Sequence, residues 1–190
     1  MQLHKRDVVA AATSLLDAYG MADLTMRRLA RELAVSPGAL YWHFANKQQL
    51  LGAVADHLLP GFDDVTGSWH ERIAALCHRL RDALLSHTDG AELVSASFAA
   101  GQSAAMDHLL TVLGAAAVEA GVGSGNAELA ARTVVYYVLG FTADEQSRLQ
   151  WDAAGADVTQ PVWTENPTAR FTFGLQLLVD GIAAHSRTRS

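Results

Sequence analysis

Residues 25–47, TMRRLARELAVSPGALYWHFANK, carry the pattern that most constrains this chain. Thr25 and Ser36 are each suited to cap the start of a helix, because their hydroxyls accept a hydrogen bond from a backbone N–H one turn later. Pro37 follows Ser36 at the first helical position, where its missing N–H costs nothing. The segment therefore predicts two short helices separated by a tight turn, with a third helix beginning near Lys47.

The two short helices divide their residues between a core face and a polar face. Leu29 and Leu33 fall on one side of the first helix, and Leu40 and Phe44, four apart, anchor the second. Small residues at the start of the second helix allow close approach to base edges, while basic and aromatic side chains reach phosphates. This division is typical of a helix-turn-helix that enters the major groove of DNA. The candidate DNA-binding residues are Thr25, Arg27, Arg28, Ser36, Pro37, Gly38, Ala39, Tyr41, Trp42, His43 and Lys47.

The rest of the chain also predicts helices, and no period-2 alternation lasts long enough to predict a sheet. The fold class is therefore all-α. Residues 152–166, which contain Pro161 and are followed directly by Pro167, predict a loop. The predicted helices outside the helix-turn-helix cover residues 8–19, 47–59, 68–86, 92–100, 104–120, 126–151 and 167–184.

Residues 11–54 resemble the DNA-binding domain of the TetR family of bacterial transcriptional repressors, and the run LYWHFANK at 40–47 is especially characteristic. Three later stretches, 83–94, 138–146 and 171–182, resemble the regulatory domain of the tetracycline repressor branch. The resemblance implies an N-terminal three-helix helix-turn-helix domain over residues 1–47. A larger helical domain over residues 48–190 would bind an effector and dimerise. The implied function is a repressor that binds a palindromic operator in double-stranded DNA as a homodimer and is released by a small molecule.

Two of the later helices suggest association between subunits. Their apolar residues recur at helical spacing, and their glycines would let partner helices approach closely. The same face could instead pack inside the monomer. One small head makes few DNA contacts, whereas two heads read two half-sites, which favours a dimer. The candidate interface residues are Val134, Val138, Phe141, Phe171, Gly174, Leu175, Leu178 and Gly181.

The resemblance also places an effector pocket near Leu76, Leu80, Val94 and Asp144. Tetracycline repressors hold drug-bound Mg²⁺ with a histidine soon after the stretch DGA, and Val94 occupies that place here. Leu76 and Leu80 stand where that branch has polar and aromatic drug contacts. Asp144 keeps a carboxylate where the branch has a glutamate. The expected effector is therefore a small molecule other than Mg-tetracycline, and we expect no cofactor and no metal.

The charge is unevenly distributed along the chain. Residues 1–47 hold six Lys and Arg against four Asp and Glu, while the remainder holds eight against sixteen. A basic head on an acidic body confines DNA contact to the head, because the body repels phosphates. The start of the chain lacks the apolar run of a signal peptide, and no apolar stretch is long enough to span a membrane. We therefore expect a cytoplasmic protein without membrane contact.

An enzyme is the main alternative, followed by a helical ligand-binding or interaction protein that does not bind an operator. The eight histidines form neither an HxxxH pair nor an HExxH motif, and no serine lies in a nucleophile-elbow pattern. His70, Cys77 and His78 could share a helix face but lack a fourth ligand for zinc. Cys77 is the only cysteine and is expected to be an inert core residue. Asp144 and Glu145 are expected on a solvated helix surface. No catalytic residue is predicted.

Overall fold

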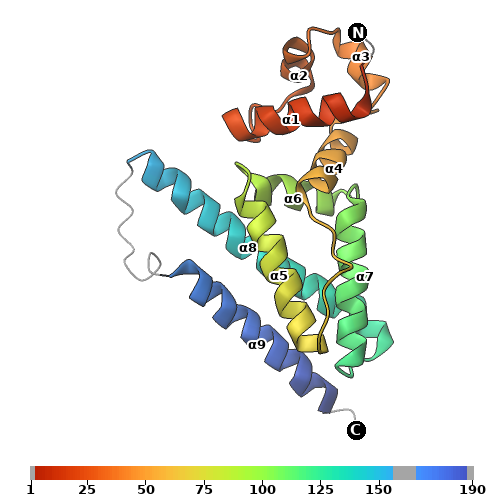
Figure 1. Cartoon of the computed structure of the whole chain (residues 1–190), viewed down its shortest axis with the longest axis vertical. Coiled ribbons are helices and arrows are strands. Elements are labelled where there is room, and N and C mark those ends of the chain that lie inside the picture. The colour runs from red at the N-terminus through yellow and green to blue at the C-terminus, as the bar shows by residue number, and fades with distance from the viewer. Residues whose placement is uncertain (1–2, 156–165, 188–190) are drawn as a thin grey trace. The chain divides into compact units, whose positions relative to one another are not determined.

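The computed structural model describes residues 3–155 and 166–187, and all of its regular structure in these ranges is helical (Figure 1). This confirms the predicted all-α class. The expected loop at 152–166 falls mostly on residues 156–165, which lie outside the described ranges. The helices are α1 (Lys5–Tyr19), α2 (Met26–Glu32), α3 (Pro37–Tyr41), α4 (Lys47–Leu58), α5 (Trp69–Leu85), α6 (Gly90–Ala99), α7 (Ala104–Glu119), α8 (Ser124–Ala153) and α9 (Pro167–Arg187).

Side-chain caps set the starts of the helices in the N-terminal segment. The Thr25 hydroxyl accepts a hydrogen bond from the Arg28 N–H at 3.2 Å, and the Ser36 hydroxyl accepts one from the Ala39 N–H at 3.3 Å. Asn46 caps α4 in the same way through the Gln49 N–H at 2.9 Å. The turn between α2 and α3 places Ala34 at a φ of 53°, a left-handed conformation that costs a residue with a Cβ about 1–2 kcal/mol.

The chain forms two compact units, and each is built from two separate stretches of sequence. The first comprises residues up to Pro60 together with residues 82–107, and the second comprises residues 61–81 with the chain from His108 onward. In the first unit α1 packs on α2 and α4, and α4 packs on α6. Leu16, Leu50 and Leu93 are almost fully buried there. The division between residues 47 and 48 stays a prediction, because α4 and α6 belong to the same unit as the helix-turn-helix.

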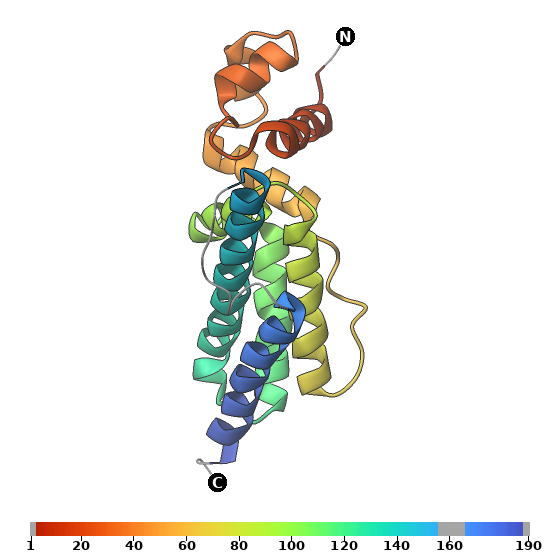
Figure 2. The same cartoon turned by 90° about the vertical axis from the view of Figure 1, so that its left-hand side faces the viewer.

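The second unit is a bundle built around the long helices α8 and α9. The two helices pack against each other, and Figure 2 shows them running side by side. Phe171 of α9 has no exposed surface and lies against Tyr137 and Phe141 of α8, with ring centroids 5.6 and 5.4 Å away. His78 of α5 meets the edge of the same ring at 5.1 Å. Among the described residues, no helix combines the length and the apolar character needed to cross a bilayer.

Candidate nucleic-acid interface

The second helix of the helix-turn-helix, α3, packs on the core of the first unit with one face and exposes its other face to solvent. Leu40 and Phe44 are 0% and 4% exposed and fix it to the core of the first unit, as their spacing predicts. Gly38 is exposed, and a Cβ added there would find only the Ser36 hydroxyl, 3.8 Å away. Because no bulky side chain projects at Gly38, a base-pair edge can approach the start of α3 closely.

The aromatic residues that follow Gly38 point mainly into solvent. Tyr41 is 50% exposed and Trp42 is 91% exposed, so the Trp42 indole contributes little to the core. The Trp42 indole is therefore available for contact with a partner surface.

The two adjacent arginines of α2 have different surroundings. Arg28 forms an ion pair with Asp23, and its guanidinium lies 3.9 Å from the ring centroid of Tyr19. Arg27, the preceding residue, is exposed. The Arg28 guanidinium thus already contacts Asp23 and Tyr19, whereas the Arg27 guanidinium is available to nucleic acid.

The remaining candidate DNA-binding residues are exposed or half-buried. Thr25, Ser36 and Pro37 are exposed, and Ala39, His43 and Lys47 are half-buried. Lys47 begins α4, directly after the turn that follows α3. All of these assignments to DNA contact remain predictions, which the proposals below develop.

The candidate dimer residues lie mostly inside the subunit. Val138 and Phe171 are fully buried, and Val134 and Leu175 are each 2% exposed. A Cβ on Gly174 would lie 2.3 Å from the Tyr137 hydroxyl, so this glycine serves an internal contact. Phe141, Leu178 and Gly181 keep some exposed surface. Most of these side chains therefore pack inside the monomer, which is the alternative that the sequence left open.

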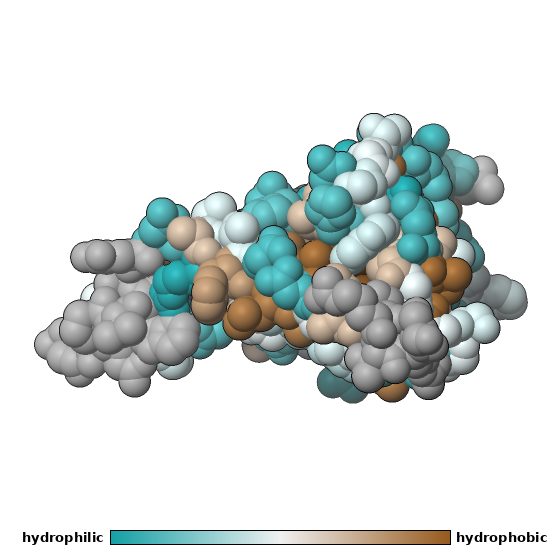
Figure 3. Space-filling model, turned by 90° about the horizontal axis from the view of Figure 1, so that it is seen from below, coloured by the Kyte–Doolittle hydropathy of each residue, from teal (hydrophilic) through white to brown (hydrophobic). Residues whose placement is uncertain are grey.

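A different set of apolar side chains on α8 and α9 faces solvent. Leu129 and Tyr136 of α8 are 65% and 58% exposed, and Phe173 and Leu177 of α9 are 68% and 58% exposed. Leu129 and Leu177 also line a groove of about 360 Å³ between the two helices. Apolar residues gather on the face seen from below in Figure 3. We call Leu129, Tyr136, Phe173 and Leu177 the outer stripe. Sequence alone does not distinguish the outer stripe from the buried apolar residues of the same helices, because both sets recur at helical spacing.

The residues assigned to the effector pocket divide into buried and exposed. Leu76 and Val94 are fully buried, and Leu80 is 1% exposed. Asp144 is exposed on α8 and pairs with Arg148, one turn later, at 3.0 Å. The assignment of these four residues to an effector pocket stays a prediction.

A buried ion pair in the second unit went unpredicted. The Arg81 guanidinium donates to both carboxylate oxygens of Glu145, Nε to Oε2 at 2.9 Å and Nη2 to Oε1 at 2.6 Å. The two side chains are only 6% and 12% exposed, and the Arg81 guanidinium also lies 5.2 Å from the Phe171 ring centroid. The expectation of a solvated surface thus holds for Asp144 and is wrong for Glu145. No local signal could reveal this, since the partner lies 64 positions away.

Within the described residues, no three or more His, Cys, Asp and Glu side chains gather as a metal site would require. Cys77 is 2% exposed, and burial raises the pKa of its thiol far above the ordinary value. Only the thiolate is a nucleophile, so both access and ionisation are blocked.

We therefore expect Cys77 to resist a thiol reagent in the native protein. Labelling by 5,5′-dithiobis(2-nitrobenzoate) near pH 8 should proceed at least 100-fold more slowly in buffer than in 6 M guanidinium chloride. The Cys77→Ser variant gives the background. Rapid labelling of the native protein would contradict the buried placement and reopen a redox role.

Comparisons with known proteins agree with this architecture. The family model for bacterial regulatory proteins of the tetR family matches residues 8–54, and the model for the tetracyclin repressor-like C-terminal domain matches residues 60–163. The chain is 33% identical over 205 residues to the tetracycline repressor protein class A from transposon 1721 of Escherichia coli, covering 96% of this chain and 91% of that protein.

Solved structures extend the likeness to the whole fold. The crystal structure of Mycobacterium smegmatis BioQ matches with a TM-score of 0.87 and 64% identity, over 96% of this chain and 99% of that one. BioQ with its natural double-stranded DNA operator matches with a TM-score of 0.85 and 62% identity, over 97% and 100%. These matches confirm the resemblance carried by residues 11–54 and its extension to the later helices. The chain belongs to the TetR family of repressors, and it is a DNA-binding transcriptional regulator.

Proposed function

We propose that this chain is a repressor that recognises the operator bound by BioQ, or one of closely similar sequence, and binds it as a homodimer. The observation that carries the proposal is the 62% identity to a chain solved with its operator, which leaves almost no part of either chain unmatched. The open surface of α3 and the exposed Arg27 supply the groups that such recognition needs. We propose a cytoplasmic location, because a repressor needs access to the chromosome, and the proposed role requires no catalysis.

A homodimer is supported by the outer stripe on α8 and α9. Leu129, Tyr136, Phe173 and Leu177 are more than half exposed, and a second copy would remove their apolar surface from water. Two heads would also double the number of base contacts and require an operator with two-fold symmetry. The buried residues Val138 and Phe171 would then stabilise the interface from within each subunit.

The proposed effector is a small molecule of more apolar character than Mg-tetracycline. The support is that Leu76 and Leu80 are apolar and almost fully buried. The match to a tetracyclin repressor-like C-terminal domain supports ligand control as such. A coupling free energy of about 1–3 kcal/mol between effector and operator would release the promoter to a useful degree.

The test is direct binding to the BioQ operator. Fluorescence anisotropy should show that the wild-type protein prefers this duplex over a scrambled duplex of the same composition by about 10³-fold or more at physiological salt. Mass measurement of the complex should give two protein chains per operator. Equal affinity for the two duplexes would refute the proposed operator, and one chain per operator would refute the homodimer.

Tyr41 and Lys47 are proposed to contact phosphates, so their removal should change the salt dependence of binding. Lys47→Ala should weaken binding to every duplex and reduce the slope of log K against log salt by about one per head. Tyr41→Phe should weaken binding with a smaller change in slope. Arg79→Ala is the matched control, because Arg79 pairs with Asp64 in the second unit. An unchanged slope for Lys47→Ala would contradict the phosphate contact.

A further inference from the structure

Lysine is rare in this chain, and both lysines lie in its DNA-binding head. Of the 14 Lys and Arg residues, two are lysines, Lys5 and Lys47, and the other twelve are arginines. The amine of lysine is a target of acetylation, which removes its charge, whereas the guanidinium of arginine stays protonated. Acyl transfer to side-chain amines can therefore change the charge of this protein only in the head.

Each lysine is the first residue of a helix, Lys5 of α1 and Lys47 of α4. A positive charge at this end opposes the helix dipole, so neither ammonium group stabilises the helix to which it belongs. Within the described residues, no hydrogen bond or ion pair engages the Lys47 Nζ. The charge of Lys47 is therefore available to an anion outside the protein, such as a DNA phosphate.

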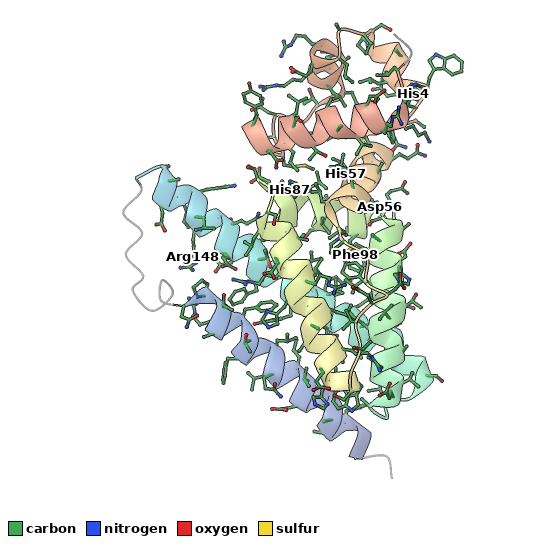
Figure 4. The ribbon with its side chains drawn as sticks, in the orientation of Figure 1. His4, Asp56, His57, His87, Phe98 and Arg148 are labelled. Carbon is green, nitrogen blue, oxygen red and sulfur yellow. The ribbon has the colours of Figure 1, made fainter. Side chains whose placement is uncertain are left out.

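The two lysines flank the turn between α3 and α4. The Lys5 Nζ lies 5.6 Å from the ring centroid of Phe44, which is in that turn, and Lys47 follows Phe44 by three residues. Figure 4 labels His4, the residue that immediately precedes Lys5. Lys5 is exposed and Lys47 is half-buried, so a small reagent can reach both in the free protein. Both belong to the first compact unit.

We propose that Lys5 and Lys47 are acylation sites, through which an activated acyl group, supplied as an acyl phosphate or a thioester, lowers the affinity for DNA. The neutral amine attacks the acyl carbon, so that the C–N bond of an amide forms while the C–O bond to phosphate or the C–S bond to the thiol breaks. Phosphate or thiolate leaves, and the nitrogen loses a proton to water. Each reaction removes one positive charge beside α3. The inference rests on the phosphate contact proposed above for Lys47 and not on the identity of the operator.

Two variants isolate the contribution of the lysines. The double variant Lys5→Arg with Lys47→Arg keeps both charges and removes both reactive side-chain amines. Adding Ala153→Lys to this pair restores one reactive amine at the last residue of α8, an exposed position in the second unit. A cation at that end of a helix suits its dipole. The N-terminal amine is common to all three proteins, so its contribution cancels.

The experiment treats the three proteins with acetyl phosphate, and in a parallel arm with acetyl-coenzyme A, and follows each site by mass spectrometry. Acetylated wild-type protein should lose about tenfold or more in affinity for the BioQ operator and for a random duplex, with a salt slope smaller by about two per head. Both arginine variants should keep their affinity. Bound operator should slow the reaction at Lys47 and leave that at position 153 unchanged. Reaction with one donor alone identifies the class of the acyl carrier.

Full affinity in wild-type protein acetylated at both lysines would overturn the inference. An equal loss in the double arginine variant would overturn it as well, because the effect would come from another group. The same holds if both lysines stay unmodified under conditions that modify position 153. Thermal unfolding should be nearly unchanged by acetylation, and a large fall that tracks the lost affinity would mean unfolding instead. Failure of untreated wild type to prefer the BioQ operator would refute the proposed operator, while the random duplex would still test the acylation sites.

Discussion

Replacing Gly38 by glutamate is expected to abolish specific operator binding without unfolding the protein. The added side chain has room, because only the Ser36 hydroxyl lies within 4 Å of its Cβ and the position is exposed. On DNA, the same side chain would fill the space that a base-pair edge needs and would bring a carboxylate toward phosphates. At about 1–3 kcal/mol for each impaired head, a dimer should lose roughly 2–6 kcal/mol of specific binding.

The measurement is operator affinity beside thermal unfolding, both at one protein concentration. Ala18→Glu adds the same charge at an exposed position near the end of α1 and should leave operator binding nearly unchanged. Gly38→Ala should give a smaller loss and a change in which base pairs are preferred. Full operator affinity in Gly38→Glu would exclude the start of α3 from the DNA interface.

Replacing Glu145 by alanine is expected to give the largest loss of stability among single changes outside the apolar core. It would leave the Arg81 guanidinium at a site where the side chain is only 6% exposed, without the carboxylate that receives two of its hydrogen bonds. Breaking a buried pair on one side typically costs about 3–5 kcal/mol. For a chain of this size each 1 kcal/mol lowers the Tm by about 2–4 °C, so a fall of roughly 6–20 °C is expected.

Asp144→Ala is the matched control, because it removes the neighbouring carboxylate from an exposed pair with Arg148. An exposed pair contributes about 0–1 kcal/mol, so its loss should barely move the unfolding curve. The double variant Arg81→Met with Glu145→Leu should recover most of the stability, since apolar residues of similar volume often replace a buried pair without loss. Equal destabilisation by Glu145→Ala and Asp144→Ala would contradict the burial of the Arg81–Glu145 pair.

Local chemistry was enough to predict the helices and their starts. The caps at Thr25 and Ser36, the proline after Ser36 and the apolar spacing each act within a few residues, so the sequence displays them directly. The helix-turn-helix could therefore be placed to within a residue or two at each end. Its candidate DNA-contact residues could be proposed from their types, whereas the exposure of Trp42 and of Arg27 required the structure.

Contacts between distant residues could not be predicted in the same way. Val138 and Phe171 carry a periodicity that suits a subunit core and a dimer interface equally well. The burial of Glu145 depends on Arg81 of another helix, and Asp56 accepts a hydrogen bond from Ser103, 47 positions later. Each of these features arises only when the fold brings two helices together.

The interleaving of the first compact unit bears on how regulators of this kind can be recombined. Residues 82–107 complete the surface on which α4 rests, although 21 residues of the second unit come between them and Pro60 in the chain. A hybrid joined at residue 60 would give α4 a foreign α6 to pack on, with its buried side chains Leu51, Val54 and Leu58 set against an unmatched partner. A hybrid joined at residue 47 would instead set α4 against a foreign α1. Exchanging operator preference between two such proteins therefore calls for moving both stretches together, or for substituting only the surface residues of α2 and α3.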